Sequence, residues 1–259
     1  MLSLPWYARI GTKLVLVRLP FGYRIWQRLN LFKHGLMEKP EYAYGVFKLH
    51  YDRAPFARKG RGFVGLEIGP GDSLFSAICA YAFGAKHTYL VDSGRFARED
   101  VESYRAMATF LARQGLVPPD LARASSLADV LSASSAEYGS RGIESLRSIP
   151  SDCVDFVWSH AVLEHIRLDE FDSFMRELAR ILRPDGVCSH RVDLTDHLGG
   201  ALNNLRFTQS TWESEWMANS GFYTNRIRFG RMMNMFSQAG FKAEIIGVDR
   251  WHRLPTPRF

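Results

Sequence analysis

Short runs of apolar residues alternate along the chain with segments in which apolar positions recur every three or four residues. The short runs predict β-strands, at residues 63–68, 87–91, 136–138, 154–159, 186–193 and 242–248. The segments with helical periodicity predict helices, at residues 73–83, 98–114, 169–182 and 226–239. Strands that alternate with helices pair in parallel through right-handed crossovers. The pattern therefore predicts an α/β fold with a doubly wound, mostly parallel sheet.

Residues 1–61 differ from the rest of the chain in charge. They hold twelve Lys and Arg residues against three acidic residues, a net charge of +9, whereas residues 62–259 hold 21 against 24, a net charge of −3. Four prolines divide the first region into short pieces, which predict short helices. We therefore expect a basic helical N-terminal cap at residues 1–61 and an α/β domain at residues 62–259.

The basic region is also rich in apolar and aromatic side chains, and two interpretations follow. Either residues 1–32 form an anchor at an anionic membrane surface, where basic residues mixed with Trp and Leu are typical, or the region packs over the active site. Lys13 and Arg18 interrupt the apolar residues, so no stretch reaches the roughly 20 residues of a membrane span. The region also lacks the apolar core of a signal peptide. We expect a cytoplasmic protein, with membrane contact at most peripheral.

The number and placement of the cysteines bear on the redox compartment. The chain has 259 residues, of which 46% are hydrophobic, so it has enough apolar material to bury a core. Each of the three cysteines, Cys79, Cys153 and Cys188, falls inside or beside a predicted core element. An odd number so placed predicts reduced thiols, as in a cytosolic chain. Their spacing matches no metal site, and the sequence predicts no bound metal.

One segment joins an apolar strand to a glycine turn and a helix. Gly69 and Gly71 follow the first predicted strand in the sequence Glu-Ile-Gly-Pro-Gly-Asp-Ser, and Asp92 ends the second strand 21 residues after Gly71. Glycines let the backbone approach a ligand because they carry no Cβ. A carboxylate at the end of the second strand accepts hydrogen bonds from ribose hydroxyls. This layout is typical of a site for an adenosine-containing cofactor.

Three segments together resemble the class I S-adenosylmethionine-dependent methyltransferases. In the first, Glu67 precedes the turn, and Leu74 stands where a dinucleotide fingerprint has its third glycine. In the second, residues 152–165 read Asp-Cys-Val-Asp-Phe-Val-Trp-Ser-His-Ala-Val-Leu-Glu-His, which resembles the family's fourth strand and the start of its next helix. In the third, residues 177–186 run from a helix into a Pro-Asp-Gly turn. The resemblance covers roughly residues 62–195.

The resemblance implies S-adenosylmethionine as the cofactor and assigns residues to its methionine and ribose parts. The residues that it places around the methionine end are Glu67, Gly69, Pro70, Gly71, Asp72 and Ser73. It also implies that Asp92 holds the ribose, with Ser93 beside it.

The same resemblance implies contacts for the adenine ring. Gly142 stands where the family often has an acid, so Ile143 is expected to pack on the ring and Glu144 to supply the polar contact. Ser159 and His160 end the fourth predicted strand, at the edge of the sheet where ligands bind.

Methyl transfer to a hydroxyl requires a base, and histidine is the usual choice because its pKa lies near working pH. Four histidines lie near the expected mouth of the sheet, namely His160, His165, His190 and His197. We predict His197 or His165 as the base, with Asp193 as its orienter or as a contact to the substrate. The alternative for each histidine is a structural, hydrogen-bonded role.

A second resemblance concerns the acceptor. Residues 31–35, 38–42 and 199–207 resemble a bacterial methyltransferase subgroup whose members are often associated with cell-surface polysaccharide assembly. With this association, we expect O-methylation of a small molecule, or of a glycan or lipid-linked intermediate of the cell envelope. Residues 196–225 hold polar and aromatic side chains that could bind such a substrate, so we expect them to form a substrate-side insertion. A nucleic-acid acceptor is not favoured, because the core lacks an array of basic and aromatic residues.

Two other functions stay open at this point. A nicotinamide-dependent oxidoreductase has a similar fold, although the missing third glycine and the Leu-Glu-His segment argue against it. A non-catalytic partner protein that binds the cofactor is the other alternative. After residues 186–193 we predict a single further strand, where the family usually has two. A truncated sheet leaves an open edge, which favours a homodimer.

Overall fold

A computed structural model of the protein describes residues 36–54, 62–197 and 201–255. The chain divides into two compact units. The sheet unit comprises Trp26–His160 and Arg180–Arg191, and the helical unit comprises Met1–Ile25, Ala161–Ala179 and Val192–Phe259. Most of residues 1–61, to which the sequence assigns the basic cap, and all of residues 1–32, to which it assigns membrane contact, lie outside the described residues.

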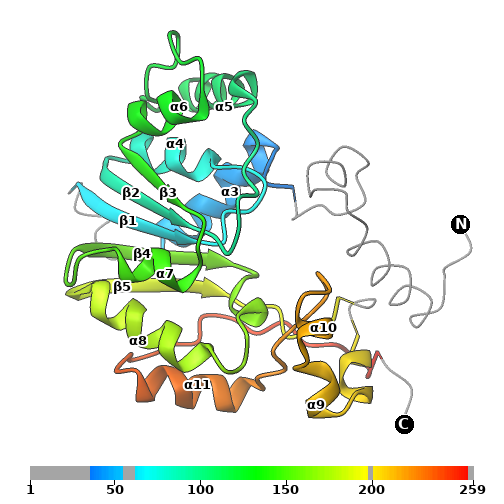
Figure 1. The fold of residues 1–259 in the computed structure, drawn as a ribbon. Coiled ribbons are helices and arrows are strands. Elements are labelled where there is room, and N and C mark those ends of the chain that lie inside the picture. The colour runs from blue at the N-terminus through cyan, green and yellow to red at the C-terminus, as the bar shows by residue number, and fades with distance from the viewer. Residues whose placement is uncertain (1–35, 55–61, 198–200, 256–259) are drawn as a thin grey trace, which may run out of the picture. The chain divides into compact units, whose positions relative to one another are not determined.

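The sheet unit is built on parallel strands (Figure 1). The strands are β1 (Phe63–Ile68), β2 (Ala85–Val91), β3 (Ala136–Gly139), β4 (Val154–His160) and β5 (Leu182–Arg191). Among the described residues they form a five-stranded sheet in the order β3-β2-β1-β4-β5, and every neighbouring pair is parallel. The α/β class and the parallel sheet predicted from the apolar runs are therefore confirmed. Because the strand order reverses between β1 and β4, the carboxyl ends of these two strands form a topological switch point.

The fifth strand begins earlier than predicted. The Pro-Asp-Gly turn was expected to separate the preceding helix from the strand, but β5 starts at Leu182, directly after the helix. Val154 pairs with Leu182 and Phe156 pairs with Val187, so the register shifts between these two pairs. The Pro-Asp-Gly residues form the irregular part of the strand, which fits the rule that proline within a sheet is confined to edges and bulges.

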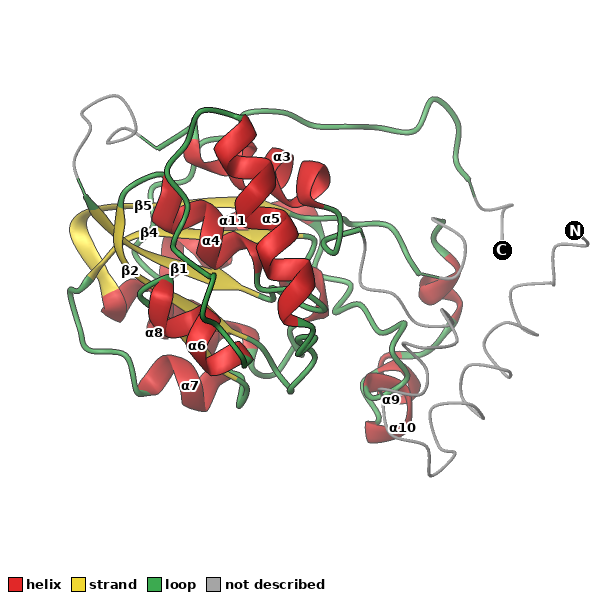
Figure 2. Cartoon of the chain, turned by 90° about the horizontal axis from the view of Figure 1, so that it is seen from above, coloured by secondary structure: helices red, strands yellow, loops and turns green. Residues whose placement is uncertain are grey.

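Helices cover the sheet within the same unit. They are α3 (Pro40–Tyr51), α4 (Phe75–Ala82), α5 (Val101–Arg113), α6 (Leu127–Ala133) and α7 (Ile143–Arg147). Figure 1 shows α3, α4, α5 and α6 on one side of the sheet, and Figure 2 shows α4 and α5 in front of the strands when the molecule is seen from above. Local signals fix their starts: Pro40 is the first residue of α3, Asp100 caps α5, and Ser126 and Asp129 form a capping box on α6.

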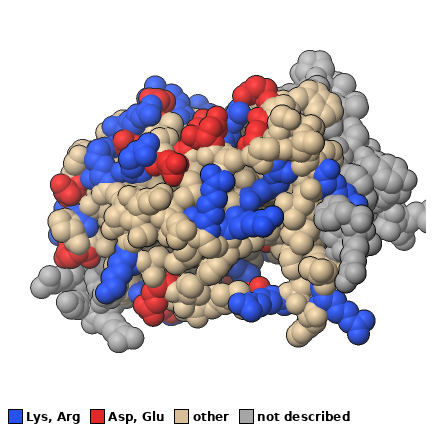
Figure 3. Space-filling model, turned by 90° about the horizontal axis from the view of Figure 1, so that it is seen from below, with Lys and Arg blue, Asp and Glu red and all other residues tan. Residues whose placement is uncertain are grey.

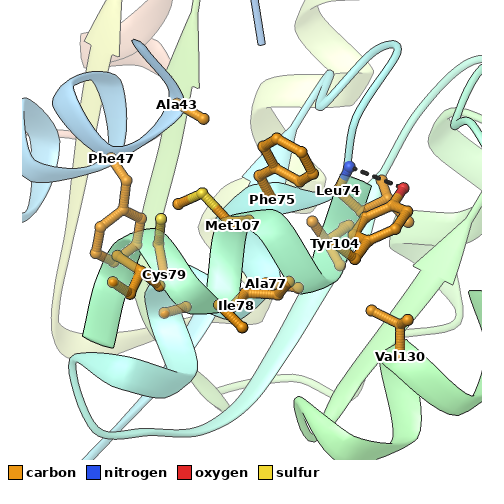
Figure 4. Packing of buried hydrophobic residues seen from close by; sticks show 14 of the residues in the cluster. Ala43, Phe47, Leu74, Phe75, Ala77, Ile78, Cys79, Tyr104, Met107 and Val130 are labelled. Atoms are coloured by element: carbon orange, nitrogen blue, oxygen red, sulfur yellow. Dashed lines mark hydrogen bonds between the residues drawn. The ribbon is translucent and has the colours of Figure 1, made fainter. Parts of the chain in front are cut away.

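The core of the sheet unit joins α3, α4 and α5 to the strands. In Figure 4 the side chain of Phe47 from α3 lies beside the side chains of α4. The side chain of Met107, which belongs to α5, also packs against α4. The Phe47 ring meets Trp158 of β4 edge to face, with ring centroids 5.3 Å apart. The amide of Leu74 donates to the hydroxyl of Tyr104 at 3.4 Å, the bond drawn in Figure 4. The core therefore holds the start of α4 in place, directly after the glycine turn.

The helical unit consists of short helices and irregular segments. Its elements are η2 (Leu163–His165), most of α8 (Phe171–Ile181), η3 (Asn203–Arg206), α9 (Gln209–Trp212), α10 (Glu215–Ala218) and α11 (Phe229–Gln238). The Leu-Glu-His segment, expected to open a helix, forms the single 3-10 turn η2. Trp212 is fully buried and packs against Phe222 and Tyr223. This aromatic cluster is the buried core of residues 201–225, whose helices are only about one turn long.

The prediction of a sixth strand at residues 242–248 is wrong. In the structure this segment has no regular secondary structure, and Ile245, Ile246 and Val248 are 51%, 63% and 54% exposed. Residues 201–225 do not replace the strand either, since they contain helices and loops only. An apolar run indicates a strand only where it pairs with a neighbouring edge, and strand propensity depends strongly on that context. The sheet of the described residues therefore has fewer strands than the family pattern implies.

Two whole-molecule properties bear on the expected partners. In the described part of the chain, no helix is both long and apolar enough to cross a membrane. Figure 3 shows Lys and Arg side chains interspersed with Asp and Glu on the face viewed from below. This mixture agrees with the small net charge of residues 62–259.

The three cysteines are free thiols, as predicted from their odd number.

Candidate functional site

The turn after β1 adopts the backbone conformation that its glycines permit. Gly69 and Gly71 have φ values of 69° and 71°, in the left-handed region that residues with a Cβ rarely adopt. Pro70, between them, is buried. The amide of Gly69 donates to the carbonyl of Val91 at 2.8 Å, at the end of β2. The turn therefore lies against the carboxyl end of the neighbouring strand.

Asp92 connects the turn to the end of β2. It is only 8% exposed, and its Oδ2 accepts a hydrogen bond from the amide of Gly71 at 2.9 Å. Its Oδ1 accepts from the amide of Ser93 at 3.2 Å. The Asp92 carbonyl accepts from the amide of Gly142 at 2.8 Å, where the chain enters α7. The structure thus brings the predicted ribose acid, the glycine turn and the predicted adenine segment together.

Three further predicted residues lie in or beside the same turn and are buried. Glu67, at the end of β1, accepts a hydrogen bond from the hydroxyl of Ser76. Burial raises the pKa of Glu67 to about 7, although the Ser76 hydrogen bond acts in the opposite direction. Asp72 and Ser73 are also buried. The Ser73 hydroxyl accepts from the amide of Phe75 at 3.3 Å, so it serves the start of α4.

The predicted adenine contacts differ in exposure. Gly142 has a φ of 54°, and Ile143 follows it, half-buried, as the first residue of α7. Glu144 is exposed and forms an ion pair with Arg147 one turn later. Ser93 is exposed beside Asp92.

The carboxyl end of β4 presents Ser159 and His160 to opposite faces of the sheet, because side chains alternate along a strand. The Ser159 hydroxyl is 2.8 Å from Nδ1 of His190 on β5. Nε2 of His190 is buried and has no hydrogen-bond partner in the structure described. Burial lowers the pKa of His190 to about 4. His190 is therefore a neutral histidine with a structural bond to Ser159.

His160 belongs to a different group, which includes a residue that the sequence analysis did not single out. Its Nδ1 is 3.2 Å from Nε2 of His50 on α3, and its Nε2 is 3.4 Å from a guanidinium nitrogen of Arg191. Nδ1 of His50 is 2.8 Å from the hydroxyl of Ser189. Burial, with a smaller contribution from His160, lowers the pKa of His50 to about 3. No sequence pattern points to His50, because it lies in the basic region, outside the three segments that resemble the methyltransferases.

The helical unit contains the predicted catalytic residues. His165 and His197 are exposed, and their ring centroids are 4.7 Å apart. Nδ1 of His165 is 2.8 Å from the carbonyl oxygen of Tyr223. Because a carbonyl only accepts, Nδ1 carries the proton and Nε2 is the acceptor nitrogen of the neutral ring. The structure therefore brings the two candidate bases together.

A carboxyl group close to both histidines belongs to Glu164, which the sequence analysis did not name as a site residue. One ligand atom from each of Glu164, His165 and His197 lies within 4.8 Å of the other two. Burial raises the pKa of Glu164 to about 8, although a hydrogen bond from the amide of Asp193 partly opposes the shift. The predicted orienter, Asp193, is half-buried and its carboxylate accepts from the amide of Thr195 at 2.9 Å.

A cavity of about 290 Å³ lies within the helical unit. Its lining includes Glu164, Asp193, Asn204, Arg226 and Trp251. Apolar atoms form most of its wall, and Glu164, Asp193, Arg226 and Arg228 add charged groups to it. Such a cavity suits a ligand that is mostly apolar and carries one polar end.

Comparisons with known proteins found one matching family and several solved structures to which this chain is similar. Residues 66–189 match the family described as "Methyltransferase domain". A search of curated proteins found no match. A methyltransferase from Haloferax volcanii, solved with the Trm112 activator, is 17% identical with a TM-score of 0.44, over 79% of this chain and 70% of that one. An S-adenosylmethionine-dependent methyltransferase from Listeria monocytogenes is 18% identical with a TM-score of 0.44, over 77% and 85%. A phosphoethanolamine N-methyltransferase from Haemonchus contortus is 16% identical with a TM-score of 0.42, over 76% and 36%.

Proposed function

Because this chain belongs to the class I S-adenosylmethionine-dependent methyltransferases, we propose that it methylates an oxygen atom of a small molecule, or of a glycan or lipid-linked intermediate of the cell envelope. The family assignment rests on the match of residues 66–189, which also sets aside the nicotinamide-dependent alternative. The choice of oxygen and of the acceptor class is the part that we propose.

The bond between the amide of Gly71 and the carboxylate of Asp92 is the observation that carries the cofactor site. It fixes a carboxylate at the carboxyl end of β2, directly beside a turn whose two glycines have no Cβ to obstruct a ligand. A carboxylate in this place suits the paired hydroxyls of a ribose. Buried Glu67, whose pKa burial raises to about 7, is a carboxyl group that the ammonium of a methionine moiety would favour in its ionised form. The residues present therefore fit S-adenosylmethionine.

When bound, S-adenosylmethionine supplies an electrophilic methyl group whose transfer leaves S-adenosylhomocysteine. We propose that Glu67, Gly69, Pro70, Gly71, Asp72 and Ser73 line its methionine end. Asp92 and Ser93 hold the ribose in this proposal. The remaining proposed contacts are Ile143, Glu144, Ser159 and His160. The protein's task is chiefly to hold the reactants in alignment.

An acceptor hydroxyl must also lose its proton. We propose that His165 or His197 takes it, with Asp193 as an orienting group or a contact to the acceptor. The bond from Nδ1 of His165 to the Tyr223 carbonyl supports this role, because it fixes the ring and leaves Nε2 as the basic nitrogen. The cavity of the helical unit supports an acceptor with an apolar body, such as a lipid-linked sugar or a small aromatic alcohol.

Substitution of Asp92 tests the proposed cofactor site. Asp92→Ala removes the acceptor of two backbone hydrogen bonds and of the ribose contacts, so we expect S-adenosylmethionine binding to weaken by about 1.5–3 kcal/mol, roughly 10- to 150-fold. Calorimetric titration measures the change. Asp120→Ala is the matched control, since Asp120 is exposed and bonds only to the nearby amide of Ala122 among the contacts described. Equal affinities for the two variants would remove Asp92 from the site.

A further inference from the structure

The group formed by Glu164, His165 and His197 has the composition of a metal site. Each residue offers one ligand atom, and these atoms lie within 4.8 Å of one another. Glu164 and His165 are neighbours on η2, whereas His197 comes 32 residues later in the chain. Two imidazoles and one carboxylate form the usual donor set for zinc and for iron(II), whereas magnesium and calcium prefer oxygen ligands alone.

Glu164 gives an independent indication of a missing cation. Its side chain is only 2% exposed. Oε1 accepts from the amide of Asp193 at 3.2 Å, but Oε2 is buried and has no hydrogen-bond partner in the described structure. A buried polar atom without a partner is costly. A cation bound at Oε2 would supply that partner.

His165 is held as metal-binding histidines usually are. Its Nδ1 donates to the backbone carbonyl of Tyr223 at 2.8 Å, which selects the tautomer with a lone pair on Nε2. Ligating histidines almost always donate their other ring N–H in this way, and the bond orients the ring. The Tyr223 carbonyl therefore serves as the outer partner of one proposed ligand.

Two buried polar side chains hold the backbone that carries the ligands. The amide of Asn225 donates to the carbonyls of Leu163 and Ile166, at 2.8 and 2.9 Å, on the two sides of Glu164 and His165. The carboxylate of Asp196, next to His197, accepts from the backbone amides of three residues, namely Ala201, Asn203 and Asn204. Ligands supported in this way need only small side-chain movements to bind an ion.

We propose that Glu164, His165 and His197 bind a divalent transition-metal ion of the zinc type, contrary to the expectation from sequence alone. Metal–ligand bonds of about 2.0–2.2 Å require the donor atoms to approach to roughly 3–3.5 Å. His197 is exposed, so rotation of its side chain toward Glu164 and the oriented ring of His165 can close this difference. Three protein ligands leave a coordination position open, as in catalytic zinc sites.

The open position gives the ion a role in the proposed reaction. Glu164 also lines the cavity of the helical unit, so an oxygen atom of a ligand bound there beside Glu164 could reach the open position of the ion. A bound divalent ion lowers the pKa of a coordinated hydroxyl, whose proton then leaves to water. The ion would thereby take over the task assigned above to a free histidine. This consequence rests on the proposed function, whereas metal binding itself does not.

Titration with zinc tests the site directly. The full chain is stripped with a chelator and titrated calorimetrically with Zn²⁺, and Co²⁺ is added in parallel because its visible absorption reports imidazole and carboxylate ligation. We expect one ion per chain. Loss of an outer-shell partner typically costs 10- to 100-fold in affinity, so His197→Ala and His165→Ala, which each remove a ligand, should weaken binding by about 100-fold or more. Both residues are exposed, so these variants should fold.

His252→Ala is the matched control, because His252 is exposed and lies outside the group. It should bind zinc as the unmodified chain does. Absence of binding to the unmodified chain, or equal binding by His197→Ala and His252→Ala, would overturn the proposal. Titration of the same preparation with S-adenosylhomocysteine keeps the two proposals apart: zinc binding without nucleoside binding would count against the proposed function alone.

Discussion

The two units of the chain assemble their chemical groups in different ways. In the sheet unit, Gly69, Gly71 and Asp92 meet because they end neighbouring parallel strands, and the chain between them is regular secondary structure. In the helical unit, the groups around Glu164 come from separate loops and are held by side-chain amides and carboxylates. The first arrangement is encoded in a contiguous motif. The second depends on tertiary contacts that leave no spacing signature.

The largest expected effect tests the loop-built region. Asn225→Ala removes the donors to the carbonyls of Leu163 and Ile166 and the acceptor of the Ile227 amide, all in a buried setting. Since each unsatisfied buried group costs about 1–3 kcal/mol, we expect the free energy of unfolding to fall by about 2–4 kcal/mol. Urea denaturation of wild type and variant measures this loss in the free energy of unfolding.

Asn219→Ala is the matched control for this substitution. Asn219 is exposed, and its amide bonds only to Glu215 among the contacts described. We expect a change within about 0.5 kcal/mol. Equal losses for the two variants would show that Asn225 does not organise the helical unit.

An intermediate effect concerns the buried histidine of β5 in the sheet unit. His190 has a pKa lowered from 6.5 to about 4 by burial, so the unfolded chain takes up its proton first as the pH falls. The stability associated with neutral His190 is present above pH 6.5 and is lost between pH 6.5 and 4, about 2 kcal/mol of it by pH 5. The raised pKa of Glu67 acts in the opposite direction, so wild type alone does not isolate this contribution.

The comparison of wild type with His190→Asn isolates the contribution of His190 to the pH dependence of stability. Asparagine can keep a hydrogen bond to Ser159, and unfolding is measured in urea at pH 7 and at pH 5. Between these pH values the variant should lose about 2 kcal/mol less stability than wild type. His252→Asn, at an exposed position, should follow wild type. If His190→Asn also follows wild type, His190 is not neutral in the folded protein.

The smallest expected effect separates backbone conformation from packing. A Cβ added at Gly45, in α3, or at Gly115, after α5, would meet no atom within 4 Å. Gly45 lies within a helix, so Gly45→Ala should stabilise the protein by about 0.5–1 kcal/mol. Gly115 has a φ of 77°, so Gly115→Ala should destabilise it by about 1–2 kcal/mol. Thermal unfolding measures both changes, and equal signs would contradict the account of α3.

The sequence was sufficient to predict what depends on local pattern. The strand and helix pattern located the five strands of the described sheet. The glycine turn and the acid that ends the second strand singled out Gly71 and Asp92, which the structure joins by a hydrogen bond. The same reasoning failed at residues 242–248, because an apolar run does not reveal whether a neighbouring edge pairs with it.

The other omissions have a common physical cause. His50 joins the sheet unit only because α3 packs its Phe47 against Trp158, which places the imidazole at the ends of β4 and β5. Glu164 stands inside a recognised segment, yet its burial and its unpartnered oxygen follow from loops that arrive much later in the chain. Pairings over such sequence distances depend on tertiary packing, which no local pattern encodes.

Calorimetric titration of the purified chain with S-adenosylhomocysteine, with NAD as a parallel titrant, tests the central claim most directly. The claim is that the glycine turn and Asp92 of the sheet unit form a site for S-adenosylmethionine. The account predicts saturable binding of S-adenosylhomocysteine at one site per chain and none of NAD. Binding of NAD alone, or of neither compound, would contradict it.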